Sequence, residues 1–117
     1  LRGDCAMQLQ HVNVGYRASE ATLRDVARVE TLGAHAGKFK TDGPWLFGAY
    51  SLADAFYAPV CARFIGYDLP ISDAARTYCK TTISDPAFKA WRAEGLKVTY
   101  DPCPYDMGVP TAEWPIA

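Results

Sequence analysis

The side chains best suited to chemistry in this sequence are two histidines and four cysteines. His11 and His35 each lack a second histidine at the helical offset that metal-binding pairs use, so we expect structural or solvent-facing roles for both. The cysteines lie 56, 18 and 24 residues apart, without the close pairs of metal sites and redox motifs. We therefore expect free thiols and no bound metal. The four cysteines are Cys5, Cys61, Cys79 and Cys103.

No local signature of catalysis accompanies these residues. A Ser/His or Cys/His catalytic pair forms in space and is not visible as sequence neighbours, so that alternative stays open, but nothing in the sequence supports one. No glycine-rich phosphate loop occurs either. The sequence thus predicts no catalytic and no cofactor-binding residue within these 117 positions.

Asp54 is the acid most in need of an explanation, because it stands inside an apolar segment. A buried carboxyl group with a raised pKa can act as a general base. However, Ser51 precedes Asp54 by three residues, which is the spacing of a capping box at a helix start. We interpret Asp54 as a structural cap, and predict that Asp54→Ala costs about 1 to 2 kcal/mol of stability.

Length and composition predict an ordinary globular domain. The chain has one domain's worth of residues, half of them apolar, and 12 basic against 13 acidic side chains give a formal charge of −1. This balance does not favour nucleic acid or an anionic membrane as partner. No signal peptide and no apolar run of about 20 residues is present, so we expect a cytoplasmic protein.

Two segments carry the clearest helix signals. Apolar residues spaced by three predict an amphipathic helix over residues 19–32, capped by Ser19. Residues 52–65 are apolar on nearly every face, so we expect a central helix that is buried almost all round. Pro59 should bend this helix, and Gly66 should end it.

Two further helices complete the expected set. Ser72 or Asp73 suits the N-cap of a helix to about residue 82, and Asp85 followed by Pro86 suits the start of another, with Phe88 and Trp91 facing inward. Four prolines after Tyr100 predict an extended tail. No strand alternation is evident. The expected fold class is all-α, a bundle of about four to five helices around a buried central helix.

The segment "GPWLFGAYSLADAFYAPV", residues 43–60, resembles the loop and central helix of the C-terminal domain of cytosolic glutathione transferases. In that family a glycine, a Ser or Thr cap and an Ala-Asp pair recur in this order, here as Gly48, Ser51, Ala53 and Asp54. "LRGDCAMQLQ" resembles the later part of the domain's long first helix in a bacterial branch, "DPAFKAW" its last helix, and the proline-rich tail a closing segment. Gly33 departs from the family, where a large aromatic residue such as tryptophan is expected.

The resemblance implies that residues 1–117 form the substrate-side helical domain of a larger enzyme. That enzyme would conjugate or otherwise transform small hydrophobic electrophiles with glutathione as co-substrate, which is a detoxification activity. A thioredoxin-like domain before Leu1 would bind glutathione and supply the activating Ser, Tyr or Cys, so the chain alone should be inactive. The full-length protein would be a homodimer. The substrate-pocket wall would include Cys5, Met7 and Tyr105, for which simple packing is the alternative.

Two other interpretations remain open at this stage. The same helical domain occurs in proteins that use it as a non-catalytic interaction module, and a missing upstream thiol-activating residue would favour that role. Alternatively, the chain is an unrelated helical bundle. A sheet within these residues, or Ser51 far from a helix start, would favour the unrelated bundle.

Overall fold

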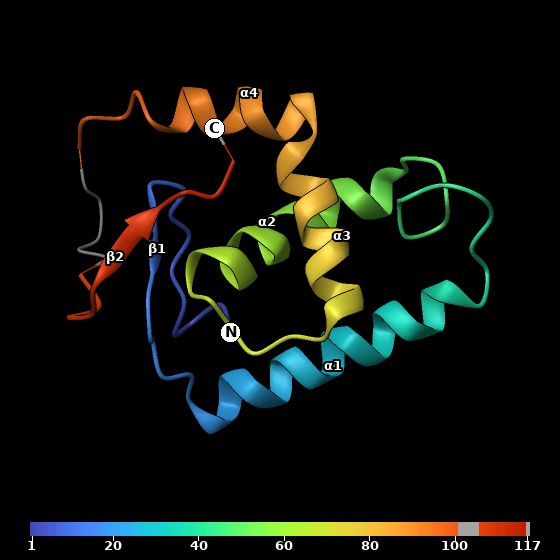
Figure 1. Cartoon of the computed structure of the whole chain (residues 1–117), viewed down its shortest axis with the longest axis horizontal. Helices are drawn as coiled ribbons and strands as arrows, with labels where there is room; N and C mark the ends of the chain where they lie inside the picture. Colours follow the sequence, from blue (N-terminus) through green and yellow to red (C-terminus); the bar gives the residue numbers. More distant parts are fainter. Residues whose placement is uncertain (101–105, 117) are drawn as a thin grey trace.

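The computed structural model describes residues 1–100 and 106–116 and is mainly helical (Figure 1). Helices α1 and α4 lie along opposite sides of the view in Figure 1, with α2 and α3 between them. The closest packing is between α2 and α3, and α1 lies less closely against its neighbours. In chain order the elements are β1 (His11–Asn13), α1 (Glu20–Gly37), α2 (Leu52–Gly66), α3 (Asp73–Ser84), α4 (Pro86–Gly95) and β2 (Thr111–Glu113).

Helix α1 begins where its cap predicts. The Ser19 hydroxyl oxygen accepts a hydrogen bond from the Thr22 backbone N–H at 3.1 Å. The helix then continues through Gly33 and ends at Gly37, further than the predicted end. Its buried residues are Thr22 and Val26, whereas the ends of the helix are mostly exposed. The first half of α1 therefore contributes most to the core.

Helix α2 starts after Ser51 and ends at Gly66, as predicted, but it is not buried along its whole length. Its second half lies in the core, which includes Phe64 and Ile65. In its first half, the side chains of Leu52 and Phe56 are 73% and 72% exposed. The prediction of a helix buried almost all round is wrong for this half, because no described part of the chain covers that face.

Helices α3 and α4 also begin at their predicted caps. The hydroxyl of Ser72 accepts from the Ala75 N–H, and the Asp85 carboxylate accepts from the Ala87 N–H. Trp91 does not face inward as predicted, since it is 42% exposed. Phe88 is buried as predicted, and the Trp91 ring packs edge-to-face with it, with centroids 5.4 Å apart.

Residues 1–10 do not form the end of a long helix, so this part of the resemblance is wrong. Their carbonyl groups are bonded to side chains of α2 and the residue after it. Arg63 Nε donates to the Cys5 carbonyl at 2.7 Å, and the Tyr67 hydroxyl donates to the Ala6 carbonyl at 2.7 Å. A helix would bond these carbonyl groups internally, whereas here they accept from side chains distant in sequence. Residues 1–10 therefore lie along α2 as an irregular segment, which we call the strap.

A two-stranded antiparallel sheet joins the two ends of the described chain. Strand β1 pairs with β2 in the register His11 to Glu113 and Asn13 to Thr111. The all-α prediction is wrong in this detail, because strands of three residues carry too little alternation to detect. The presence of a sheet favours the interpretation as an unrelated helical bundle. The position of Ser51 at a helix start does not favour it. The fold as a whole is mainly helical, with four helices in the described residues.

Candidate functional site

The loop before α2 is shaped by two glycines that approach each other. Gly43 and Gly48 have φ values of 130° and 103°, which residues with a side chain rarely adopt. A Cβ atom added to Gly48 would lie 2.4 Å from the Thr41 Oγ1 atom and 2.7 Å from the Asp42 carbonyl oxygen. Glycine at position 48 is therefore required by both backbone conformation and space, and it sets the entry of the chain into α2.

Ser51 and Asp54 form the capping box that the sequence predicts. Its shorter bond runs from the Ser51 backbone N–H to Asp54 Oδ2 at 2.8 Å, and the Ser51 hydroxyl donates to the same oxygen at 3.4 Å. In the reciprocal half of the box, the Asp54 backbone N–H meets the Ser51 side chain, and it also donates to the Ser51 carbonyl oxygen at 3.0 Å. The first turn of α2 is thus held from both directions.

The other oxygen of Asp54 has partners that sequence spacing does not indicate. Oδ1 accepts from the Leu46 backbone N–H at 3.1 Å and from the Tyr78 hydroxyl at 2.8 Å. Burial, followed by this bond to Asp54, raises the pKa of Tyr78 far above its ordinary value. With the carboxylate fully buried and both oxygens occupied, Asp54 joins the loop, α2 and α3 and is not available as a base.

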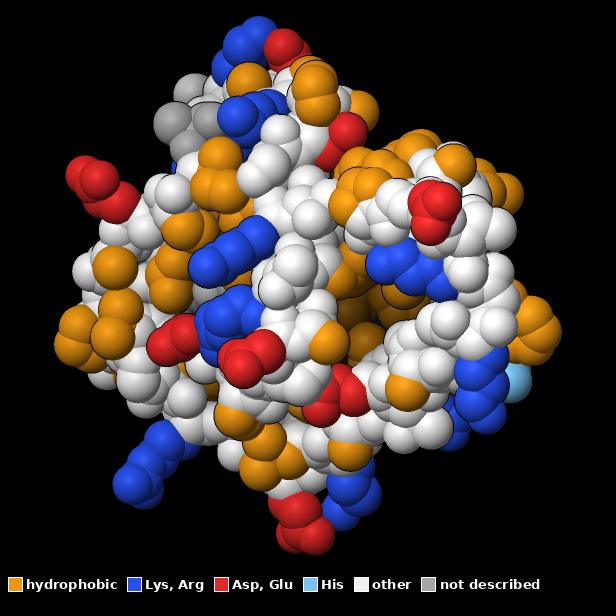
Figure 2. Space-filling view, turned by 45° about the vertical axis from the view of Figure 1, so that its right-hand side comes forward, with side chains coloured by type: hydrophobic (Ala, Val, Ile, Leu, Met, Phe, Trp, Pro, Cys, Tyr) orange, Lys and Arg blue, Asp and Glu red, His pale blue; other side chains and the backbone are white. Residues whose placement is uncertain are grey.

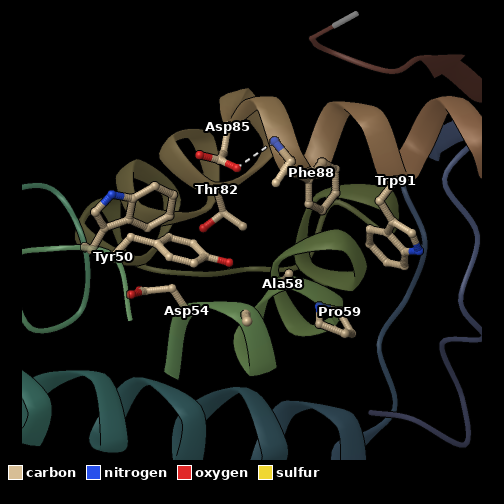
Figure 3. Close-up of a pocket in the computed structure, with 11 residues that line it drawn as sticks. Tyr50, Asp54, Ala58, Pro59, Thr82, Asp85, Phe88 and Trp91 are labelled. Carbon is tan, nitrogen blue, oxygen red and sulfur yellow. Dashed lines mark hydrogen bonds between the residues drawn. The ribbon is translucent and has the colours of Figure 1, made fainter. Parts of the chain in front are cut away.

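A groove of about 280 Å³ lies between the first half of α2 and the corner where α3 meets α4 (Figure 3). We call it the α2–α4 groove. Figure 3 shows Phe88 and Trp91 at one end of it and Tyr50 toward the other. Its aspartates and its threonine are used by the fold: Asp54 caps α2, Asp85 caps α4, and the Thr82 hydroxyl donates to the Tyr78 carbonyl at 3.0 Å. These features suit binding of an apolar group better than catalysis. The groove is lined by Trp45, Tyr50, Asp54, Ala55, Ala58, Pro59, Thr82, Asp85, Ala87, Phe88 and Trp91.

The described cysteines are free and buried, as expected for thiols that pack in a core. Cys61 and Cys79 are neighbours: the Cys79 thiol donates to Cys61, which together with burial raises the pKa of Cys79 strongly. The Cys61 thiol in turn lies 3.6 Å from the Thr82 hydroxyl oxygen. Cys103 lies outside the described residues. A protonated, buried thiol such as Cys79 is a poor nucleophile.

The predicted substrate-pocket residues are placed as follows. Cys5, within the strap, is fully buried, and burial raises the pKa of its thiol. Met7 is half-buried and packs against the core. Neither residue lines the α2–α4 groove. Tyr105 lies outside the described residues, so the assignment of these three to a substrate pocket stays a prediction.

An exposed apolar face, made of Tyr50, Leu52 and Phe56, is the feature that sequence reasoning missed. Leu52 and Phe56 stand four residues apart on α2 and therefore share one side of the helix. The sequence does contain a signal for this face: a helix that is apolar on every side needs other parts of the protein, or a partner, to cover every side. Large exposed apolar side chains that gather on one face are typical of interaction surfaces.

Among the described residues, no three His, Cys, Asp or Glu side chains gather closely enough to hold a metal ion. The side chains of His11 and His35 make no hydrogen bond to a serine or cysteine in the described ranges, and the His35 ring packs on Phe39. No described helix is long and apolar enough to cross a membrane. No family model, curated protein or solved structure matches the chain.

Proposed function

We propose that this chain is the substrate-side helical domain of a glutathione transferase-like protein, acting in the cytoplasm on small hydrophobic electrophiles. The observation that carries the proposal is the arrangement around the start of α2, where Gly48 allows the close turn and Ser51 and Asp54 make the capping box. The same residues carry the sequence resemblance. In the structure, Gly48 is the residue that fits the turn, and Ser51 and Asp54 stabilise the first turn of α2.

The chemistry would be divided between two domains. The α2–α4 groove is lined mainly by apolar side chains, which suits the body of an electrophile and not a charged tripeptide. The two carboxylates of the groove, Asp54 and Asp85, are both bonded within the fold and are not free to activate a thiol. Glutathione, as co-substrate, would therefore bind to a thioredoxin-like domain, whose Ser, Tyr or Cys would favour the thiolate form.

The exposed apolar face at the start of α2 supports contact with another folded unit. Leu52 and Phe56 are among the most exposed large apolar side chains of the described chain. In the proposed protein this face packs against the thioredoxin-like domain or against a second subunit of a homodimer. The same face favours the alternative of a non-catalytic interaction module, which would need the contact but not the chemistry.

Glutathione binding by the complete protein tests the proposal. We expect the 117-residue chain to give no heat signal with glutathione in a calorimetric titration, and the protein translated from the whole gene to bind it saturably. The complete protein should also conjugate glutathione to 1-chloro-2,4-dinitrobenzene, followed by absorbance. Binding without conjugation of any electrophile tried would favour the interaction module. A complete protein that neither binds glutathione nor contains a thioredoxin-like domain would refute the proposal and leave the unrelated bundle.

The role of the exposed face has its own variant and matched control. In the complete protein, Leu52→Ser with Phe56→Ser should weaken glutathione-dependent activity at least tenfold while helix content is retained. Phe39→Ser changes a residue of similar exposure, 64%, at the far end of α1 and should leave activity unchanged. Equal activity of both variants would contradict the assignment of this face to a domain or subunit contact.

A further inference from the structure

A second cavity, of about 490 Å³, lies between α1, α2 and α3, and we call it the α1 cavity. Figure 2 shows a hollow on this side of the molecule with hydrophobic side chains at its bottom and charged side chains at its rim. Its size falls within the range of roughly 300 to 1,000 Å³ that small-molecule sites occupy. The larger side chains of its wall include Val29, Trp45, Tyr57, Val60, Phe64 and Tyr78.

The wall formed by α1 is unusually bare. Beyond Val29 and Glu30, the cavity is lined from this helix by Gly33, Ala34 and Gly37 alone. A Cβ atom added to Gly33 or to Gly37 would have no heavy atom of another part of the chain within 4 Å. Close packing normally leaves no such space beside a core. The volume therefore exists because α1 presents backbone where another helix would present side chains.

The chemistry of the opposite wall indicates what would fill the space. Aromatic rings reach the cavity from the loop, α2 and α3, and rings of this kind favour stacked or edge-to-face contact with another aromatic ring. Two charged residues belong to the lining. Lys40 is exposed to solvent, and the Glu30 carboxylate accepts a hydrogen bond from the Ser72 N–H at 2.6 Å. The Tyr78 hydroxyl is already bonded to Asp54. Lys40 is thus the one charged side chain of the described lining that is not bonded within the fold, and a neutral ligand loses the least hydration on entering the cavity.

We propose that the α1 cavity binds a neutral, flat aromatic molecule of two or three fused rings. An apolar cavity of about 150 Å³ holds one benzene ring, so a cavity roughly three times larger suits a fused-ring molecule. The bare wall at Gly33 suits the face of such a ring. This site goes beyond the proposed transferase function, because Cys5 and Met7 do not line it and it requires no glutathione.

Binding of indole to the 117-residue chain tests the site. Calorimetric titration should give saturable binding to the wild-type chain. Gly33→Trp fills the cavity from α1 and should weaken binding at least tenfold, as should the smaller Gly33→Leu. Gly33→Ala is the matched control: it removes the same glycine but adds a single carbon, and should change affinity less than threefold. Circular dichroism and thermal unfolding verify that each variant is folded.

A second measurement locates the ligand without any substitution. Cys61 and Cys79 line the α1 cavity, whereas Cys5 is equally buried but does not. Saturating indole should shift the backbone amide resonances of Cys61 and Cys79 at least threefold more than that of Cys5, measured by ¹H–¹⁵N correlation NMR. Three results would overturn the proposal: no saturable binding by the wild-type chain, equal shifts of all three cysteine amides, or unchanged affinity in folded Gly33→Trp and Gly33→Leu variants.

Discussion

Removing the Asp54 carboxylate should destabilise the fold by more than the loss of a helix cap. A lost cap costs about 1 kcal/mol. In addition, Asp54→Ala leaves the part-buried Tyr78 hydroxyl and Leu46 N–H without their acceptor. Because both donors are part-buried, each costs about 1 to 2 kcal/mol when left unsatisfied, the lower part of the usual range. We therefore expect a loss of about 3 to 5 kcal/mol, against the 1 to 2 kcal/mol estimated from the sequence alone.

Urea unfolding followed by circular dichroism measures this loss. With a slope of about 2 kcal/mol per molar urea, the midpoint of Asp54→Ala should fall by about 2 M. Tyr78→Phe is the control that removes one donor and keeps the carboxylate, and it should cost about 1 to 2 kcal/mol. In the double variant, the two losses should not add, because both remove the same hydrogen bond. A loss for Asp54→Ala no greater than that for Tyr78→Phe would refute the reasoning.

Three further predictions concern single positions. Gly33→Ala should raise stability by about 1 kcal/mol through helix propensity, which thermal unfolding would record as a rise of about 4 °C; no rise would indicate strain in α1. Gly48→Ala should destabilise by more than about 2 kcal/mol in urea, because of its φ of 103° and the contact with Thr41. Bonds from Ser19 and then Thr22 lower the pKa of Asp4 below 3.8. The carboxylate therefore stabilises the fold above that pH, so Asp4→Asn should be less stable at pH 7, and the difference should shrink as pH falls below 3.8. A difference that stays constant from pH 7 to pH 2 would contradict it.

The starts of the helices could be predicted because their signals are local. Ser19, Ser51, Ser72 and Asp85 each act on a backbone N–H two or three residues ahead, so the sequence around them contains the whole interaction. The end of α1 could not be placed as well. Gly33 suggested a weak point there, but the helix passes through it to Gly37.

The irregular strap and the sheet could not be predicted, because their partners are distant in sequence. The first ten residues contain nothing that indicates bonds from Arg63 and Tyr67 to their carbonyl groups. At the site, the capping role of Asp54 followed from Ser51, whereas its bond to Tyr78, which stands 24 residues later, required the structure. Both cavities depend on how helices lie against one another, and spacing along the chain does not determine that.

The sheet between β1 and β2 has a consequence for the order of folding. Its pairing of His11 with Glu113 closes a loop of roughly 100 residues, which costs about 4 kcal/mol of chain entropy before any contact is gained. Helices α2, α3 and α4 follow one another directly and can pack with far shorter loops. We expect them to form the folding nucleus and the sheet to join late. Trp114, next to β2 and stacked on Phe88, then seals the core at the last step.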